Sequence, residues 1–151
     1  MQVGVVGLGR MGANITRRLM KGGHRCVVFD ANLQAREALV QDGATDAGSL
    51  ASLVDALRET PRTVWVMLPA GAITEETVAQ LGSLLEADDV VIDGGNSFYN
   101  DDIRRAKQLG RKRIHYIDCG TSGGVWGLER GYCMMIGGPK AAVDRLDPIF
   151  A

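Results

Sequence analysis

The sequence has few of the residues that bring metals, disulfides or polyanions to a protein. Its three cysteines are an odd number without a CxxC pair, which indicates neither a disulfide framework nor a zinc site. Its two histidines, His24 and His115, have no metal-ligand partner at a useful spacing, so we expect no metal. The formal net charge of −1 argues against a surface for nucleic acid, because such proteins usually carry a marked basic excess.

Long hydrophobic runs are also missing. No apolar run approaches the roughly 20 residues that a membrane-spanning helix needs. Gln2 leads into an apolar stretch without the charged region of a signal peptide. We therefore expect a cytoplasmic protein that binds neither membrane nor nucleic acid. With 151 residues, the chain has the length of one domain and can bury a core.

Positive charge is concentrated in one segment, residues 104–113 (RRAKQLGRKR). This segment starts in a predicted helix that opens with Asn100, Asp101 and Asp102. Acids therefore stand at the start of the helix and bases at its end, as the helix dipole favours. We interpret the segment as a solvated helix face, with a weak anion-attracting patch as the alternative.

Short β-branched runs alternate with amphipathic stretches along the chain. The runs barely alternate in polarity, which suits strands buried on both faces of a parallel sheet. Predicted strands cover residues 3–7, 25–30, 63–68, 89–93 and 114–119. Predicted helices run from Met11 until Gly22-Gly23 and over residues 33–40, 49–57, 74–85 and 100–109. The repetition predicts an α/β fold, a Rossmann-like doubly wound, mostly parallel sheet with helices on both faces.

The last predicted helix opens with Gly137, Gly138 and Pro139, because proline is favoured in the first turn of a helix. Its apolar face is interrupted by Pro148, and neither a cap nor a tail follows it. We expect the chain to be the N-terminal piece of a longer protein.

Residues 7–12 (GLGRMG) form a GxGxxG that follows a predicted strand and opens a predicted helix. In this context Gly7 allows a tight turn, Gly9 lets the backbone approach a pyrophosphate, and Gly12 lets the helix pack close to the strand. The helix N-terminus offers free N–H groups and a positive dipole end to the phosphates. The pattern predicts a dinucleotide site, and a merely structural turn is the alternative.

Asp30 ends the second predicted strand, 18 residues after Gly12. A carboxylate at about this spacing can accept hydrogen bonds from the adenosine ribose hydroxyls. It would repel a 2′-phosphate, and the next residues, Ala31 and Asn32, are not basic. This pattern favours NAD over NADP. An aspartate that caps the next helix, a role compatible with ribose binding, is the alternative.

A second glycine-rich segment, residues 118–127 (DCGTSGGVWG), contains the string GxSxG that marks the nucleophile of α/β-hydrolases. That fold needs a histidine after the serine in the chain, and both histidines here precede Ser122. We therefore reject a nucleophilic role for Ser122.

The position of residues 118–127 after a predicted strand suggests a role in ligand binding instead. In open α/β sheets, ligands lie beyond the carboxyl ends of the strands. Three predicted strands end in residues 67–71 (MLPAG), 93–97 (DGGNS) and 118–127, so these loops should meet where the nicotinamide would lie. Small residues, hydroxyls and glycine N–H groups suit a polyhydroxylated acid. For DGGNS, a plain turn is the alternative.

Four segments, in this order and spacing, resemble the decarboxylating 6-phosphogluconate dehydrogenase family. They are GLGRMGAN, MLPAG, DGGNSFYND and GTSGGVWGLERGYCMMIGG. The resemblance runs from residue 3 to the end, and DGGNS with TSGGVWG is more specific than the glycine loop. The related 3-hydroxyacid dehydrogenases share GxGxMG and SGG but usually carry an Asp-x-Ser-Thr sequence at DGGNS, so Asn96 separates the two groups.

The resemblance implies roles for the matched residues. Asn96 would contact both nicotinamide and substrate, and Ser122, Gly123 and Gly124 would bind the sugar acid near its carboxylate. The residues implied for the cofactor are Gly7, Leu8, Gly9, Arg10, Met11, Gly12, Asp30, Ala31, Asn32, Leu68, Pro69, Ala70 and Asn96. NADP-using members carry Asn-Arg-Ser/Thr at positions 30–32, so this chain resembles the NAD-preferring type.

The resemblance also implies a reaction in which 6-phosphogluconate is oxidised and decarboxylated to ribulose 5-phosphate, in the pentose phosphate pathway or gluconate utilisation. A lysine base and a glutamate acid serve the family. None of the four lysines here stands in the family's Lys-x-x-His-Asn context, so no catalytic residue is expected within this chain. We expect both residues in a helical domain beyond Ala151 that also forms the homo-oligomer, and the fragment alone should be inactive. The alternatives are a 3-hydroxyacid dehydrogenase without decarboxylation and a stand-alone NAD-binding module.

Overall fold

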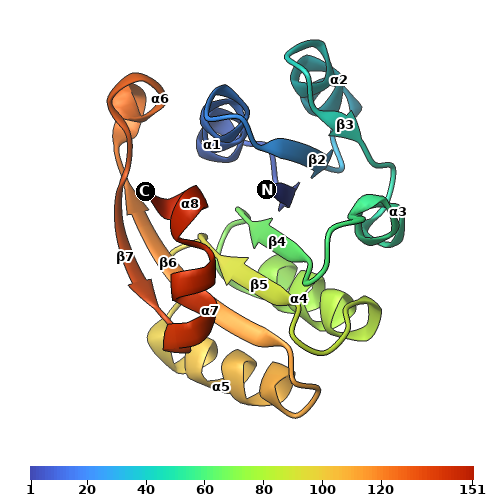
Figure 1. Cartoon of the computed structure of the whole chain (residues 1–151), viewed down its shortest axis with the longest axis vertical. Helices are drawn as coiled ribbons and strands as arrows, with labels where there is room; N and C mark the ends of the chain where they lie inside the picture. The colour runs from blue at the N-terminus through green and yellow to red at the C-terminus, as the bar shows by residue number, and fades with distance from the viewer.

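The computed structural model describes all 151 residues as a seven-stranded sheet with helices on both faces (Figure 1). The strands are β1 (Gln2–Val6), β2 (Arg25–Phe29), β3 (Thr45–Asp46), β4 (Thr63–Val66), β5 (Val90–Asp93), β6 (His115–Ser122) and β7 (Cys133–Gly137). Their order in the sheet is β3-β2-β1-β4-β5-β6-β7. All neighbours are parallel except β6 and β7, which pair antiparallel. The predicted Rossmann-like, mostly parallel α/β sheet is confirmed.

Helices connect the parallel strands. They are α1 (Arg10–Lys21), α2 (Leu33–Gln41), α3 (Leu50–Ala56), α4 (Ala72–Leu84), α5 (Tyr99–Gly110), α6 (Gly127–Arg130), α7 (Lys140–Arg145) and α8 (Asp147–Phe150), with a 3₁₀ turn, η1 (Gly124–Trp126). Gly22 and Gly23 end α1 as predicted, and Gly23 takes a φ of 91° that favours glycine. No helix combines the length and the apolar character that crossing a membrane requires.

Two hydrophobic cores lie on opposite faces of the sheet. The first joins the sheet to α1, α2, α7 and α8, and contains Ile15, Leu39 and Leu146. The second joins it to α3, α4 and α5, and contains Leu53, Leu81 and Leu109. Because both faces are covered, the β-branched residues of β1, β4 and β5 are almost fully buried.

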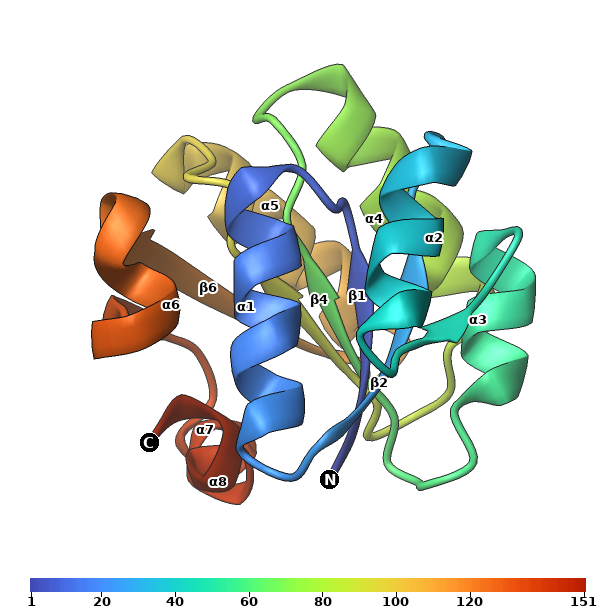
Figure 2. The same ribbon diagram turned by 90° about the horizontal axis from the view of Figure 1, so that it is seen from above.

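The carboxyl ends of β1, β4 and β5 point to one edge of the sheet. In Figure 2 the loops that follow these three strands lie together along the upper edge of the molecule. The polypeptide leaves β1 and β4 in opposite directions, toward α1 on one face and α4 on the other. This is the switch point at which doubly wound sheets bind their ligands.

Three local predictions were wrong. The strand predicted to stop at residue 119 continues to Ser122, because β7 pairs with residues 118–122. The two strands β3 and β7 were not predicted. The single helix predicted at the C-terminus is two short helices that meet at Leu146, and Pro148 lies in the first turn of α8.

Candidate dinucleotide site and the neighbouring glycine segment

The loop from β1 to α1 is fixed by close backbone contacts. Gly7 has a φ of 95°, and a Cβ on it would lie 2.3 Å from the carbonyl oxygen of Met67. A Cβ on Gly12 would lie 2.0 Å from the carbonyl oxygen of Gly7. Both positions therefore require glycine, one for its conformation and both for space. The contact of the loop with Met67 brings the ends of β1 and β4 together.

Gly9 differs from its neighbours, because a Cβ on it would meet nothing within 4 Å. Its backbone is open to solvent at the N-terminus of α1, where it occupies the N-cap position without a side-chain cap. The N–H groups of the first turn are therefore available to an anion. This arrangement fits the pyrophosphate of a dinucleotide, whose oxygens can approach the backbone there.

Asp30 lies at the end of β2 and faces the glycine loop. Its Oδ2 accepts a hydrogen bond of 2.7 Å from the Leu8 N–H, and its Oδ1 accepts one of 2.8 Å from the Asn32 N–H. Asn32, not Asp30, caps α2, since its Oδ1 accepts a hydrogen bond from the Ala35 N–H. The alternative prediction that Asp30 caps this helix is therefore wrong. Each carboxylate oxygen keeps a second lone pair that ribose hydroxyls can use.

Residues 93–97 lie against the end of β4. A Cβ on Gly95 would lie 2.3 Å from the carbonyl oxygen of Leu68, and a Cβ on Gly94 would lie 2.3 Å from the Met67 Sδ. The two glycines let this segment pass directly over residues 67–68. Asn96 follows with a φ of 55° and an exposed side chain. Left-handed backbone is uncommon outside glycine, and asparagine is among the residues that tolerate it best.

A buried polar cluster lies under this loop, and the sequence did not predict it. Asp93 and Arg105 are each 1 % exposed, and Tyr116 is 4 % exposed. Arg105 donates to Glu75 at 2.9 Å and to the Ser97 hydroxyl at 3.0 Å, and lies 3.4 Å from the Asp93 Oδ2. The interpretation of residues 104–113 as a solvated face is therefore wrong for Arg105. The buried face of α5 consists of Asp102, Arg105 and Leu109. A helix face this polar can be buried only if its charged groups have partners, and this was the sequence feature that could have indicated the cluster.

The charges of this cluster shift the pKa values of its acids in opposite directions. Hydrogen bonds from Arg104 and from Arg105 lower the pKa of Glu75 to about 2. Burial is the main reason that the pKa of Asp102 is raised to about 6; its hydrogen bond with Tyr116 lowers the pKa, and the neighbouring carboxylates Asp118 and Asp93 raise it. Ionised Glu75 and buried Arg105 therefore form a fixed ion pair, whereas Asp102 can change charge near neutrality.

The second glycine segment is organised by one side chain. A Cβ on Gly123 would lie 2.7 Å from the Tyr132 ring, and a Cβ on Gly127 would lie 2.2 Å from it. Gly124 has a φ of 52° and open space around it. The tyrosine ring therefore lies in the bend that these glycines leave, and the segment turns back into β7.

Ser122 is exposed at the end of β6. Trp126, later in the chain, is 55 % exposed, with the Arg130 guanidinium 4.9 Å from its ring centre. The preceding Thr121 is buried, and its hydroxyl donates to the carbonyl oxygen of Cys119. Only the serine hydroxyl of this pair is therefore available to a ligand.

Direct contacts and chain neighbours join five of the predicted site residues into one row. The row runs from Asp30 through Leu8 and Gly7 to Leu68 and Gly95, and ends at Asn96. Pro69 and Ala70 continue from Leu68 and are exposed, as are Gly9, Arg10, Ala31 and Asn32. Ser122, Gly123 and Gly124 lie at the same edge on the next strand, but no hydrogen bond links them to Asn96.

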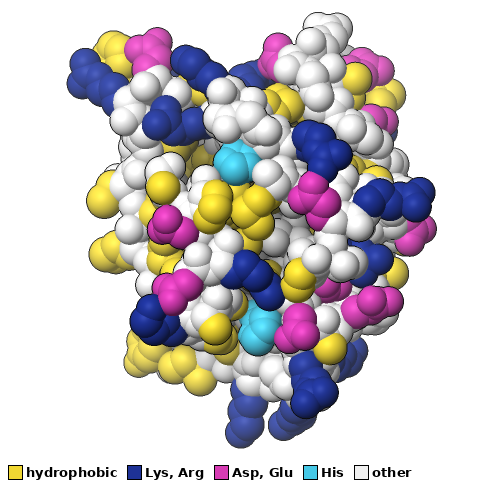
Figure 3. All heavy atoms as spheres, viewed as in Figure 1, with side chains coloured by type: hydrophobic (Ala, Val, Ile, Leu, Met, Phe, Trp, Pro, Cys, Tyr) yellow, Lys and Arg dark blue, Asp and Glu magenta, His cyan; other side chains and the backbone are white.

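A cavity of about 850 Å³ lies away from this row. It lies between α1, the start of β7 and α8, and its walls include Arg18, Trp65, Tyr132 and Phe150. The exposed face that carries α7 and α8 has basic and acidic side chains interspersed, without a continuous area of either sign (Figure 3). Within the row, Gly7 and Leu8 are buried, Asp30, Leu68 and Gly95 are partly buried, and Asn96 is exposed.

No group of three histidine, cysteine, aspartate or glutamate side chains is arranged to hold a metal ion. The three cysteines are unpaired, and burial raises the pKa of Cys26 to about 12 and that of Cys119 to about 11. Both buried thiols are therefore protonated core residues.

Comparison with known proteins agrees with this geometry. A family model described as the NAD binding domain of 6-phosphogluconate dehydrogenase matches residues 2–151. The NAD(+)-dependent decarboxylating 6-phosphogluconate dehydrogenase of Haloferax volcanii is 45% identical over 150 residues, which are 99% of this chain and 49% of that protein. The chain thus spans about half the length of this relative.

Solved structures show the same fold. Plasmodium falciparum 6-phosphogluconate dehydrogenase, described in complex with its cofactor NADP+ and with its substrate 6-phosphogluconate, superposes with a TM-score of 0.91 at 28% identity, over 99% of this chain and 33% of that one. A 3-hydroxyisobutyrate dehydrogenase from Salmonella typhimurium superposes with a TM-score of 0.87 at 24% identity, over 99% and 52% of the two chains, which shows the fold alone. With a family match over almost its entire length, the chain belongs to the NAD-binding domains of the 6-phosphogluconate dehydrogenase family.

Proposed function

We propose that this chain is the cofactor domain of an NAD-dependent dehydrogenase that converts 6-phosphogluconate to ribulose 5-phosphate and carbon dioxide. The observation that carries the proposal is the row of contacts from Asp30 to Asn96, because it joins a ribose acceptor, an open phosphate loop and a polar amide along one edge. A 45% identical relative bears the name of this NAD(+)-dependent enzyme. The pentose phosphate pathway and gluconate utilisation are the settings in which such an enzyme would act.

The charges around Asp30 support NAD as the cofactor. A 2′-phosphate at the ribose would lie against the Asp30 carboxylate, and the adjacent Ala31 and Asn32 carry no positive charge. Arg36, in the following helix, already lies 3.3 Å from Asp46 and donates to the carbonyl oxygen of Ala47. No free cation of this segment therefore offsets the repulsion between carboxylate and phosphate.

Each residue of the row has a proposed task. The backbone of Gly7, Leu8, Gly9, Arg10, Met11 and Gly12 holds the pyrophosphate, while Asp30, Ala31 and Asn32 face the adenosine ribose. Leu68, Pro69 and Ala70 line the cofactor on the side of β4. When bound, NAD supplies a nicotinamide ring that accepts hydride from the substrate.

The substrate would lie between the row and the second glycine segment. Asn96 would orient the nicotinamide and one hydroxyl of the sugar acid, whereas Ser122, Gly123 and Gly124 would donate hydrogen bonds near its carboxylate. Reaction also requires a general base and a general acid, which we place in residues outside this chain. The 151-residue chain would then bind the cofactor without turning over the substrate.

Titration calorimetry of the 151-residue chain tests the cofactor assignment. We expect NAD to bind about tenfold more tightly than NADP, because an uncompensated repulsion of about 1.4 kcal/mol between the carboxylate and the 2′-phosphate corresponds to a factor of ten in affinity. Equal or tighter binding of NADP would show that Asp30 does not exclude the 2′-phosphate.

Product analysis tests the reaction. We expect the longer protein to release carbon dioxide from 6-phosphogluconate as NADH forms. NADH formation without carbon dioxide would assign a 3-hydroxyacid dehydrogenase instead. Steady NADH production by the 151-residue chain alone would contradict the placement of base and acid outside it.

A further inference from the structure

The buried polar side chains below residues 93–97 form a connected group, which we call the Asp93 cluster. It consists of Asp93 at the end of β5, Tyr116 in β6, and Asp102 and Arg105 in α5. All four are less than 10 % exposed, and none is assigned to cofactor or substrate above. Burying this much polarity is costly unless each group has a partner, so the partners indicate what the cluster does.

The cluster holds the backbone on both sides of Asn96. Before it, the Gly95 N–H donates to the Asp93 Oδ1 at 2.9 Å. After it, the Ser97 hydroxyl donates to the Asp93 Oδ2 at 2.6 Å and accepts from Arg105 at 3.0 Å. Asn96 itself has a φ of 55°, a conformation that non-glycine residues keep only where the surrounding structure imposes it.

The proton count of the cluster identifies which acid is protonated. The Tyr116 hydroxyl lies 2.7 Å from the Asp93 Oδ2 and 2.7 Å from the Asp102 Oδ1, but it has a single hydrogen to donate. One of these two contacts therefore needs a proton on a carboxyl group. Asp93 faces Arg105 and accepts several donors, so it stays ionised. Asp102 has no side-chain partner other than Tyr116, so it carries the proton and donates to the hydroxyl, which donates to Asp93.

The surroundings of Asp102 agree with this assignment. Besides Tyr116, it faces the Asp93 carboxylate from β5 and the Asp118 carboxylate from β6, while Arg105 from its own helix is the nearby cation and is shared with Glu75 of α4. Burial and the two carboxylates raise the pKa of Asp102 to about 6. Above this pH two carboxylates compete for one hydroxyl hydrogen, and the restraint on the loop weakens.

We propose that Tyr116, Arg105 and the protonated form of Asp102 are positioning residues, which act through Asp93 to hold Asn96 in the conformation that meets the nicotinamide. The proposal rests on the proposed function for the contact between Asn96 and nicotinamide. The restraint of the loop by a shared proton does not depend on that contact and is measured separately.

Tyr116→Phe tests the positioning role, because it removes one hydroxyl and keeps the ring in the core. Calorimetry compares NAD with ADP-ribose, which has the same phosphates and ribose but no nicotinamide. At about pH 5 we expect NAD to bind about threefold to tenfold more weakly, as the loss of one buried hydrogen bond implies, with ADP-ribose unchanged within about twofold. General damage to the fold would weaken both ligands alike.

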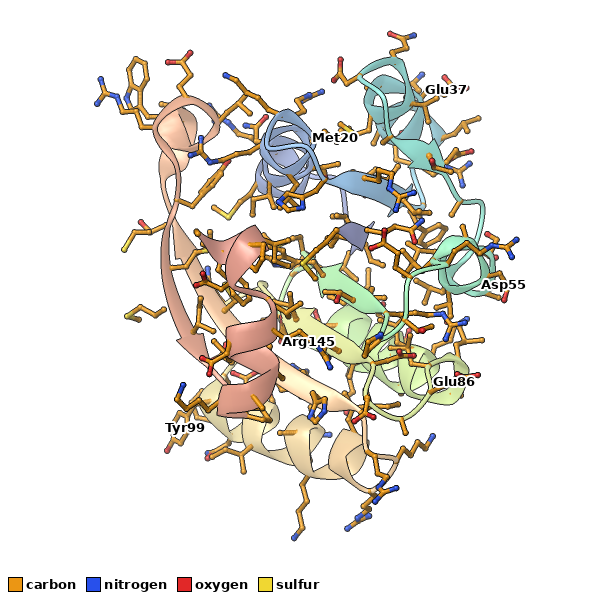
Figure 4. All side chains as sticks on the ribbon, viewed as in Figure 1. Met20, Glu37, Asp55, Glu86, Tyr99 and Arg145 are labelled. Carbon is orange, nitrogen blue, oxygen red and sulfur yellow. The ribbon has the colours of Figure 1, made fainter.

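Tyr99→Phe is the matched control. Tyr99 is 64 % exposed at the start of α5, where Figure 4 labels it, and its hydroxyl has no hydrogen bond. This change should alter the affinity for neither ligand. Equal behaviour of the Tyr116 and Tyr99 variants would overturn the positioning role.

Asp102→Asn tests the shared proton, because an amide can donate to the Tyr116 oxygen at every pH. In the wild-type chain, the NAD affinity should fall about twofold to fivefold between about pH 5 and about pH 7.5, and the Gly95 amide resonance should titrate over the same range. The variant should show neither change. A Gly95 titration that persists in Asp102→Asn would overturn the assignment of the proton to Asp102.

Asn96→Ala distinguishes failure of this inference from failure of the proposed function. If Asn96 contacts the nicotinamide, the variant loses NAD affinity and keeps ADP-ribose affinity. A loss in this variant without a loss in Tyr116→Phe refutes the positioning role alone. Unchanged NAD affinity in Asn96→Ala refutes the proposed contact, and the Gly95 titration then decides the restraint by itself.

Discussion

The two glycine-rich segments of this chain look alike in sequence but are packed in different ways. In residues 7–12, the atoms that exclude a Cβ belong to the backbone of Gly7 and Met67. In residues 120–127, the atoms that exclude a Cβ at Gly123 and Gly127 belong to one side chain, Tyr132. Backbone in a packed sheet cannot move away, whereas a side chain can rotate or be replaced. The first segment is thus specified by the fold and the second by a single residue.

This difference suits the ligands that we propose. The pyrophosphate is common to all dinucleotides, and a rigid loop with one open glycine is sufficient to bind it. A substrate acid requires a surface that can differ between related enzymes. A segment that rests on Tyr132 and exposes Ser122 and Trp126 can vary without disturbing the sheet.

The largest expected effect is that of Gly7→Ala. The new Cβ would require a φ of 95° and would lie 2.3 Å from the Met67 carbonyl oxygen. We expect the free energy of unfolding to fall by roughly 2–4 kcal/mol, from conformational strain and overpacking together. NAD binding should be lost as well. Urea denaturation and calorimetry measure the two effects.

Gly9→Ala is the matched control for this change, since a Cβ at Gly9 meets nothing within 4 Å. Its free energy of unfolding should fall by no more than about 1 kcal/mol, the cost of placing alanine at the N-cap of α1. NAD affinity should still fall, because the methyl group stands where the pyrophosphate approaches. A stable Gly7→Ala that binds NAD would refute the assignment of rigidity to the first segment.

The second effect is the pH dependence of the free energy of unfolding that Asp102 contributes from the Asp93 cluster, below residues 93–97. Its pKa is about 6 in the folded chain, against about 4 in an unfolded one, so the native state binds more protons between these values. Stability due to this group therefore falls as pH rises through the window, by about 2–3 kcal/mol. The difference in unfolding free energy between wild type and Asp102→Asn, measured by urea titration from about pH 4 to about pH 7, isolates it.

If the difference in unfolding free energy between wild type and Asp102→Asn did not change with pH, Asp102 would have the same pKa in the folded and the unfolded chain. Glu75 is expected to act in the opposite direction, because Arg104 and Arg105 lower its pKa to about 2. Its stabilisation is present above about pH 4 and is lost as pH falls toward 2. The use of Asp102→Asn as reference cancels this contribution.

The sequence predicts the parallel sheet well because the signals for it are local. Each β-branched run is long enough to be recognised as a strand, and GLGRMG indicates the turn between β1 and α1. It fails at β7, whose sequence CMMIG is short and ends in glycine, and which forms a strand only because residues 118–122 pair with it. Strand pairing of this kind is tertiary information, so residues 120–122 were predicted as loop.

The candidate site divides in the same way. Asp30 and the glycine loop were proposed from residue types and spacing, and Asn96 from the family resemblance; these roles stay predictions. Arg105 could not, since a run of basic residues does not show which one meets a buried carboxylate 12 residues earlier in the chain. The polar inward face of α5 was the one available clue.

A third prediction examines the second segment through Gly127→Ala. The new Cβ would lie 2.2 Å from the Tyr132 ring, and we expect a loss of about 1–2 kcal/mol of unfolding free energy. The double variant with Tyr132→Ala should cost at least about 1 kcal/mol less than the sum of the single changes, because the ring that clashes is gone. Additive costs in this double-mutant cycle, measured by urea denaturation, would mean that Tyr132 does not organise the segment.

The smallest effect compares two tyrosines. The Tyr132 hydroxyl is buried without a hydrogen-bond partner, whereas the Tyr116 hydroxyl meets two carboxyl groups. Removing an unpaired buried hydroxyl removes a desolvation cost, so Tyr132→Phe should raise the free energy of unfolding by about 0.5–1 kcal/mol. Tyr116→Phe should lower it by about 1–2 kcal/mol, because two paired groups lose a partner. Opposite signs in parallel urea titrations are expected if the shape of one ring holds the second glycine segment and paired polar groups hold the loop at Asn96. Equal signs would remove that distinction.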